Sequence, residues 1–264
     1  MPSQLSRVPR RHPAPPALVV VAHGSRDPRA LRTVRALLDR VRARRPGLPV
    51  HLGHIELNEP LLTDTLARLR AKEEAGRAES TGDIVLVPLL LGRGYHVKHD
   101  IPEMAATTHP HARVADALGP HPLLVDTLVS RLEEAGWPSR STDEQHRETA
   151  IVLAAAGSRD PDNAADTTRT AHLLSARLGV PVVPAYASTA EPSVPNAIAD
   201  LRARGYARVA IASYFTAPGR FATECAQAAP WIVSAPLGAH AAMADLILRR
   251  YDERADAGIT GNAA

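Results

Sequence analysis

The chain has 264 residues, of which 45% are hydrophobic and 22% are charged, and its formal net charge is +3. This length suits two domains of ordinary size or one large one, and no apolar run approaches the roughly 20 residues that a membrane-spanning helix needs. A pI of about 9.3 could indicate nucleic-acid binding. However, the arginines alternate with acidic residues along helix-like stretches, and aromatic residues make up only 3% of the chain. We therefore expect a globular protein with neither a membrane nor a nucleic acid as its partner.

The N-terminal stretch and the cysteine content bear on where the protein works. Residues 1–16 are rich in Pro and Arg and contain no apolar segment typical of a secretory signal, so we predict a disordered tail. Cys225 is the single cysteine, which allows no internal disulfide and suits a reducing compartment. We expect a cytoplasmic protein in which any metal is held by His, carboxylate or water ligands.

The first half of the chain alternates between short apolar runs and amphipathic segments. Runs rich in β-branched residues are typical of strands buried on both faces, and the segments between them place apolar residues on one helical face. The predicted strands are 17–24, 48–57, 83–91 and 112–118, and the predicted helices are 29–45, 60–76 and 122–136. Pro60 is expected at the first position of its helix, and 92–100 is expected to be a loop. This alternation predicts an α/β fold with a mainly parallel four-stranded sheet flanked by helices.

The second half repeats this order. The segment "LVVVAHGSRDP" at 18–28 returns as "IVLAAAGSRDP" at 151–161, and the later elements follow in the same register. We infer an internal duplication, and because a duplication can replace a homodimer we expect a monomer. The predicted boundaries are 17–137 for the first domain, 138–149 for a polar linker, 150–253 for the second domain and 254–264 for a tail.

The duplication separates residues that serve the fold from residues that are free to serve chemistry. Both copies keep a Gly-Ser-Arg-Asp turn, a Glu-Pro pair, and a histidine after a Leu-Gly pair, His121 in the first copy and His240 in the second. We interpret the shared turn as a tight strand-to-helix connection in which Ser or Asp caps the helix. The two shared histidines are expected to begin a helix in each half.

Three chemically active residues occur in the first half alone. They are His23, Glu56 and His96, which align with Ala156, Ser188 and Phe221. All three lie at or just past the carboxyl ends of predicted parallel strands, where ligand sites form in open α/β sheets. Two imidazoles and a carboxylate are suited to bind a borderline divalent metal or to accept protons near neutral pH. We predict that the first half carries the chemistry and that the second half has lost it.

Other chemistries fit less well. A His-Gly-Ser-Arg turn after a strand could cradle a phosphate at a helix N-terminus, but no dinucleotide or Walker glycine pattern follows it. Histidine phosphatases have an arginine where this chain has Ala22, and no G-x-S-x-G elbow of an α/β-hydrolase is present. His99 lies three residues after His96 and aligns with Glu224, so it fits a surface position as well as a metal ligand.

Four segments together resemble a known family: "VVVAHGSRDP", "IELNEPLL", "VPLLLGRGYHVKHDIP" and "LGPHPLLVD". They resemble the sirohydrochlorin chelatases, the class II tetrapyrrole chelatases of sirohaem and cobalamin biosynthesis, in their long two-domain form. The resemblance covers roughly residues 17–253. It implies two tandem flavodoxin-like domains that face each other across a cleft, the first catalytic and the second degenerate. It also implies a lyase-class chelatase that inserts ferrous iron or cobalt(II) into sirohydrochlorin and releases two protons.

The resemblance also assigns roles to residues of this chain. It implies that His23 and His96 bind the metal, and that one of them takes pyrrole protons, a task suited to an imidazole with an ordinary pKa of about 6.5. The segments expected along the macrocycle contain Glu56, Leu57, Leu91, Gly92, Arg93, Gly94 and Tyr95. Asn58, Arg93 and His99 depart from the residues that are commoner in the family.

The flanking charges and the expected ligands complete the prediction. Sirohydrochlorin is a polycarboxylate, and the cations near the two histidines could attract and hold it: Arg26, Arg29, Arg93 and Lys98. We expect no organic cofactor, and a divalent metal as co-substrate. The alternative from another class is a non-catalytic carrier of tetrapyrrole or metal, which needs the binding groups but no turnover.

Overall fold

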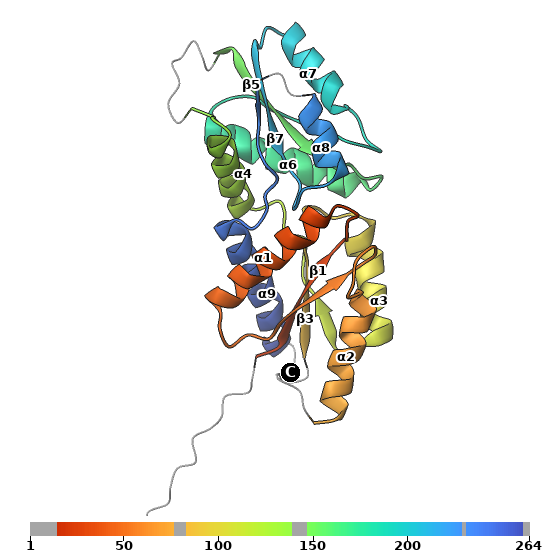
Figure 1. Cartoon of the computed structure of the whole chain (residues 1–264). Helices are drawn as coiled ribbons and strands as arrows, with labels where there is room; N and C mark the ends of the chain where they lie inside the picture. The colour runs from red at the N-terminus through yellow and green to blue at the C-terminus, as the bar shows by residue number, and fades with distance from the viewer. Residues whose placement is uncertain (1–14, 77–82, 139–146, 229–230, 261–264) are drawn as a thin grey trace, which may run out of the picture.

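The computed structural model describes residues 15–76, 83–138, 147–228 and 231–260 (Figure 1). Most of the predicted tail at 1–16 and of the predicted linker at 138–149 lies outside these residues. The first half contains β1 (Ala17–Ala22), α1 (Pro28–Arg44), β2 (Val50–His54), α2 (Leu62–Glu74), β3 (Ile84–Pro88), η1 (His96–Asp100), α3 (Ile101–Thr108), β4 (Ala112–Val114) and α4 (Pro122–Glu134). The second half contains β5 (Thr149–Ala155), α6 (Pro161–Leu178), β6 (Val182–Tyr186), α7 (Val194–Ala203), β7 (Arg208–Ser213), α8 (Arg220–Gln227), β8 (Ile232–Val233) and α9 (Ala241–Thr260).

Each half forms its own four-stranded sheet, and the two sheets have the same topology. The strand orders are β2-β1-β3-β4 and β6-β5-β7-β8, and all neighbouring strands are parallel. The repeat extends to register, because Leu18 pairs with Val50 and its counterpart Ile151 pairs with Val182. This order matches the first four strands of the flavodoxin arrangement. The predicted α/β class with two parallel sheets is therefore confirmed.

Three local predictions differ from the structure. Residues 92–100 do not form a loop throughout, because His96–Asp100 makes one π-helical turn that continues into α3. Pro102 is the second residue of α3 and directly follows this π-helical turn, in which the N–H of Ile101 donates to the carbonyl of His96. Pro60 does not start α2, because its carbonyl accepts a hydrogen bond from the backbone N–H of His54 and extends the pairing along β2. The second domain extends past its predicted end at residue 253, because α9 continues to Thr260.

The closing helix of each half packs on the other half (Figure 1). Helix α4 contacts α6 and β7, whereas α9 contacts α1 and β3. Polar contacts follow the same exchange. The guanidinium of Arg131 on α4 donates to the carbonyl of Leu237, and the guanidinium of its counterpart Arg250 on α9 donates to the equivalent carbonyl of Leu118. The exchange therefore ties the two halves together in both directions.

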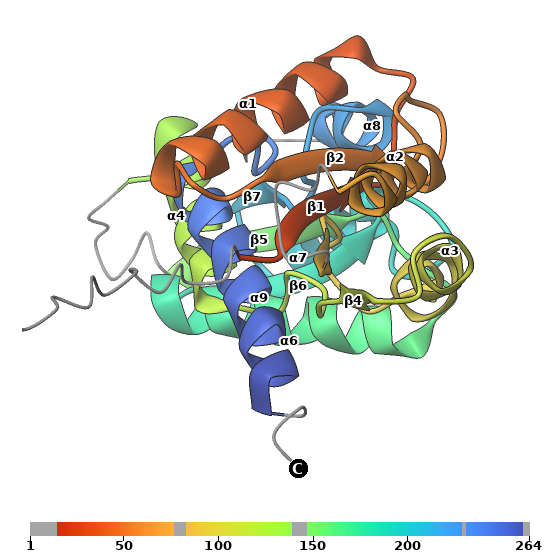
Figure 2. The same cartoon turned by 90° about the horizontal axis from the view of Figure 1, so that it is seen from below.

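The exchange creates one apolar core between the two sheets. Alternate residues of β1 divide between two faces: Leu18 and Val20 enter the central core, while Val19 faces a separate core under α2 and α3. Ile151 on β5 enters the same central core as Leu18, together with side chains of α1, α4, α6 and α9. Figure 2 shows α1 and α9 on the same side of the first half. No helix of the described residues is long and apolar enough to cross a membrane.

Replacing Leu246 on α9 by Ala tests the shared core. Leu246 is fully buried in this core, so we expect a loss of about 2–5 kcal/mol in the free energy of unfolding. Because α9 belongs to the second half of the chain and packs on α1 and β3 of the first, urea unfolding followed by circular dichroism should remain one cooperative transition at a lower midpoint. Leu173→Ala on the exposed side of α6 is the matched control. Two separate unfolding transitions, of which only the one of the second half is shifted, would contradict the shared core.

Candidate active site

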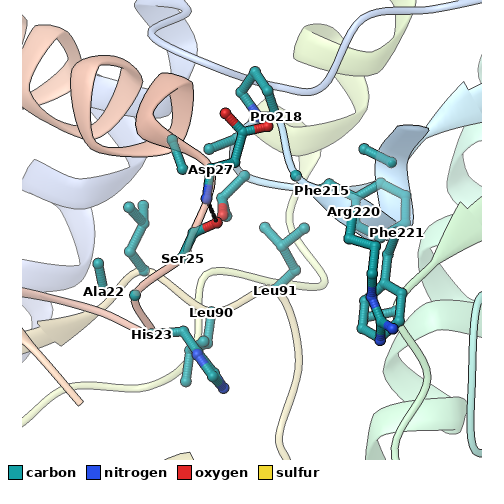
Figure 3. Close-up of a pocket in the computed structure, with 18 of the residues that line it drawn as sticks. Ala22, His23, Ser25, Asp27, Leu90, Leu91, Phe215, Pro218, Arg220 and Phe221 are labelled. Atoms are coloured by element: carbon teal, nitrogen blue, oxygen red, sulfur yellow. Dashed lines mark hydrogen bonds between the residues drawn. The ribbon is translucent and has the colours of Figure 1, made fainter. Parts of the chain in front are cut away.

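A cleft of about 1450 Å³ lies between the two halves and is lined by residues of both. It is formed at the carboxyl ends of the central strands, where His23 follows β1 and Leu89–Leu91 follow β3. Figure 3 shows His23 on one side of the cleft, Arg220 and Phe221 on the other, and Leu91 between them. The strand ends at which a ligand site is predicted therefore lie at a cleft between the domains.

A tight turn fixes the backbone beside His23. Gly24 has a φ of +107°, and a Cβ at this position would lie 1.8 Å from the carbonyl oxygen of Glu56. The N–H of Glu56 in turn donates to the carbonyl of His23. Gly157 repeats this arrangement, with a φ of +89° and a Cβ position 1.9 Å from the oxygen of Ser188. The turn thus belongs to the fold of both halves, and in the first half it sets His23 and Glu56 side by side.

The shared Asp residues cap helices, one of the two possibilities predicted, whereas the shared Ser residues accept the N–H of these Asp residues. The carboxylate of Asp27 accepts a hydrogen bond from the N–H of Arg29 at the start of α1, and Asp160 does the same at the start of α6. His121 and His240 also begin helices: each Nδ1 accepts the N–H two residues ahead. Burial lowers the pKa of both imidazoles, which favours the neutral form that this acceptor role requires. Neither histidine lines the cleft.

The two histidines unique to the first half meet in the cleft. Their ring centroids are 4.8 Å apart and the rings are nearly perpendicular, at 88°. Glu56 Oε1 lies 3.6 Å from Nδ1 of His23, and Asp100 Oδ2 lies 2.5 Å from Nδ1 of His96. A carboxylate beside Nδ1 favours a proton on that nitrogen and leaves the lone pair of Nε2 available. Each imidazole is therefore arranged as a ligand or proton acceptor through Nε2.

Asp100, the carboxylate beside His96, was not predicted from the sequence. Asp100 lies four residues after His96, a spacing that brings two side chains together only when residues 96–100 are helical. In the second half, Phe221 and Cys225 occupy the places of His96 and Asp100. Burial raises the pKa of the Cys225 thiol to about 11, so this group is neutral and packed. The histidine and its carboxylate have therefore been lost together.

His54 was also missed. It is buried at the end of β2, it lines the cleft, and its Nδ1 lies 3.1 Å from the carbonyl oxygen of Pro60. Burial lowers its pKa. The comparison of the two halves would have found it, because Tyr186 holds the equivalent position.

The histidine pair is the group in the cleft that could hold a metal. Rings at this separation can each provide one nitrogen to a single ion, at the usual 2.0–2.1 Å from the metal. Across residues 15–76, 83–138, 147–228 and 231–260, no group of three or more His, Cys, Asp or Glu side chains is placed to hold a metal. A two-nitrogen site leaves most coordination positions open to other ligands.

The residues predicted along the macrocycle fall into two groups. The first group lines the cleft and consists of Leu57, which is 51% exposed, Leu91, Gly92, Gly94 and the exposed Tyr95. Leu57 has a φ of 66°, and Thr189, one residue after Ser188, has a φ of 59°, so this conformation belongs to the fold. The side chains of Arg93 and Glu56 are not part of the lining.

The flanking cations differ in their partners. Arg29, Arg93 and Lys98 each pair with a carboxylate. Arg26 is exposed, lines the cleft and has no ion-pair partner in the part of the chain that the structure describes. The free cation nearest the turn is therefore Arg26.

Two of the residues that differ from those commoner in the family, Asn58 and His99, have local contacts that explain them. Asn58 Oδ1 accepts the backbone N–H of Ser25 at 2.7 Å, which ties the turn after β1 to the segment after β2. His99 packs against the ring of Tyr95, with centroids 4.7 Å apart, and is exposed. It does not join the histidine pair.

Comparisons with known proteins find relatives that match both halves of the chain. The family model described as CbiX matches residues 17–135 and again residues 150–254. The sirohydrochlorin ferrochelatase of Bacillus subtilis (strain 168) is 29% identical over 192 residues, which cover 70% of this chain and 68% of that relative. A sirohydrochlorin cobaltochelatase of Sulfolobus acidocaldarius is 32% identical over 120 residues, which cover 45% of this chain and 90% of that relative. The solved structure of SirB from Bacillus subtilis with Fe³⁺ has a TM-score of 0.73 at 26% identity, covering 94% of this chain and 98% of that one.

Replacing Gly24 by Ala tests the turn that aligns His23 with Glu56. The positive φ alone should destabilise the variant by about 1–2 kcal/mol, and the clash of the new Cβ with the Glu56 carbonyl should displace that segment. We expect weaker binding of Co²⁺, followed by absorption spectroscopy, as well as a lower unfolding midpoint.

Two matched variants separate these effects. Gly157→Ala should destabilise the protein to a similar degree but leave Co²⁺ binding nearly unchanged, and Gly47→Ala, which faces open space, should change neither. Equal losses of Co²⁺ affinity in Gly24→Ala and Gly157→Ala would contradict the assignment.

Proposed function

The chain belongs to the CbiX family, and we propose that it is a sirohydrochlorin chelatase that inserts ferrous iron or cobalt(II) into sirohydrochlorin. One observation carries the proposal: two imidazoles meet in the inter-domain cleft, each with a carboxylate at Nδ1. The relatives named as ferrochelatases and cobaltochelatases support the same reaction with either metal.

The reaction exchanges protons for a metal ion. A divalent ion enters the ring, and two pyrrole N–H groups lose their protons, which balances the charge. In the proposed mechanism, Nε2 of His23 and Nε2 of His96 bind the incoming ion. An imidazole released from the ion takes the two pyrrole protons in turn, passing the first to solvent before it accepts the second. Glu56 and Asp100 offset the positive charge that a metal or a proton brings to each ring.

The sparse ligand set suits transfer. Two protein nitrogens hold an ion loosely, and the remaining coordination positions are open to pyrrole nitrogens as they lose their protons. Imidazole accepts iron, cobalt, nickel and zinc, and affinity order does not set the biological choice. The proposal therefore keeps both iron and cobalt.

The cleft also suits a large anionic ring. Its volume exceeds the roughly 300–1,000 Å³ of common small-molecule pockets. Leu57 and Tyr95 expose apolar surface beside the histidines, and the segment Leu91–Tyr95 would lie along the macrocycle. On the opposite wall the guanidinium of Arg220 stacks on the ring of Phe221, at 4.6 Å. We propose that Arg26 and Arg220 hold carboxylates of the substrate from the two walls.

The central prediction concerns His23 and His96. His23→Ala and His96→Ala should each lower the rate of metal insertion at least 100-fold, because each removes a metal ligand and proton acceptor. Glu56→Gln and Asp100→Asn should lower kcat about 3- to 10-fold, since the imidazole stays but loses its charged partner. The assay follows metallated product by absorbance, with excess sirohydrochlorin and Fe²⁺ or Co²⁺.

His121→Ala is the control for this series. It removes a helix cap and should cost about 1 kcal/mol of stability, with kcat unchanged at a temperature where the variant is folded. A loss of kcat as large as that of His23→Ala would mean that the active site includes residues shared by both halves. A single stoichiometric burst of product from the unmodified protein would instead support the alternative function, a non-catalytic carrier of tetrapyrrole or metal.

Arg26→Gln tests the binding of the substrate's carboxylates. Removing one charge-assisted hydrogen bond should raise KM about 5- to 30-fold with little change in kcat. Raising the salt concentration should raise KM of the unmodified protein as well. Arg40→Gln, on an exposed position of α1, is the control. A KM unchanged in Arg26→Gln would exclude this contact.

A further inference from the structure

Side chains of the second half hold the segment that carries His96. The carboxylate of Asp166 on α6 accepts the backbone N–H of Arg93 at 2.9 Å and its guanidinium at 2.8 and 3.1 Å. The hydroxyl of Tyr214, after β7, donates to the carbonyl of Leu91 at 3.1 Å. Lys98 pairs with Asp160 and Asp162 at 2.7 and 2.8 Å. Three anchors therefore span the segment from 91 to 98.

Two of these anchors are buried and have defined positions. The Asp166 side chain is only 5% exposed, so its charge needs the Arg93 partner. Tyr214 is buried, and its hydroxyl also lies 3.3 Å from the hydroxyl of Thr170 on α6. The segment approaches α6 closely, because a Cβ on Gly92 would lie 3.4 Å from Cβ of Asp166. The contact is therefore built into the packing of α6.

The anchors exist on one side only. The first-half counterparts of Asp162, Asp166 and Tyr214 are Arg29, Thr33 and Leu89. In the mirror-related contact, a Cβ on Gly219 would lie 3.8 Å from the hydroxyl of Ser25, but no ion pair of the described residues joins α1 to the segment 216–221. The second half, which lacks counterparts of His23 and His96, thus carries the carboxylates that hold the segment with His96.

We propose that Asp166 is a positioning residue for the metal-insertion reaction and that the second half serves to hold His96 against His23. The proposal rests on the proposed function. His23 is held within the first half by β1 and by the hydrogen bond to Glu56. His96 follows Gly92 and Gly94, whose backbone is permissive, so its place depends on contacts made to the segment. Two ligands act on one ion only while their separation is held, and displacements of about 1 Å are costly.

The experiment compares Asp166→Asn with Asp245→Asn in the full chain. The first replacement keeps an acceptor for the Arg93 N–H but removes the charge that holds the guanidinium. The second removes an ion pair between Asp245 on α9 and Arg44 on α1, another contact created by the helix exchange but away from the cleft. For each we measure kcat, KM, binding of Co²⁺ alone by absorption spectroscopy, and the unfolding midpoint.

We expect Asp166→Asn to lower kcat about 10-fold and to weaken Co²⁺ binding about 10-fold, with KM changed less than kcat. Asp245→Asn should leave both quantities unchanged. Arg93→Ala should reproduce the effect, and the double variant should be no worse than Asp166→Asn alone, because both changes break the same contact. If Asp166→Asn folds poorly, Tyr214→Phe and Asp162→Asn, at a half-buried position, give the same test at smaller amplitude.

Wild-type kcat and Co²⁺ affinity in folded Asp166→Asn would overturn the proposal, as would equal losses in Asp245→Asn. The outcome is separable from the proposed function. If the unmodified protein shows no turnover but Asp166→Asn still weakens Co²⁺ binding, the chelatase function fails and the positioning role stands.

Discussion

The apolar core between the two sheets is the constraint on which the rest of the structure depends. Helices α4 and α9 each cover the other half, so neither sheet buries its inner face with its own helices alone. Burial of this kind stabilises by about 25 cal/mol per Å² of apolar surface, whereas exposed ion pairs contribute at most about 1 kcal/mol. The core therefore holds the two halves at a fixed separation, and the charged contacts near the cleft have only to place individual segments within it.

Both halves contain the same strand-to-helix turn, and in the proposed function it carries the chemistry in the first half alone. Gly24 and Gly157 have similar left-handed conformations against equivalent carbonyls, those of Glu56 and Ser188, so the backbone at the site does not depend on His23. The first half adds two histidines and two carboxylates to this common frame. Because each carboxylate lies beside an imidazole Nδ1, the four residues form two pairs, and the second half lacks both members of each pair.

Much of the fold and part of the site could be predicted because the signals are local. Helix α1 was placed within one residue at each end, since Asp27 caps it and its apolar residues follow a helical period. His23, Glu56 and His96 were found by comparing the two halves. The helix exchange could not be predicted, because an amphipathic helix has the same pattern whichever sheet it covers. Asp100 and Asp166 have partners that become neighbours only through a helical turn or through tertiary packing.

The loss of the histidines from the second half has a physical consequence for the proposed reaction. One macrocycle between two histidine pairs would face two competing metal sites, and a second bound cation would repel the ion being inserted. Phe221 and Ala156 instead present apolar surface on that wall, with the guanidinium of Arg220 stacked beside it. A wall of this kind can cover one face of a ring and bind its carboxylates while the opposite face meets the metal. Under the proposed function, the duplication therefore gives the two halves different tasks within one cleft, with metal transfer on one wall and support of the ring and of the His96 segment on the other.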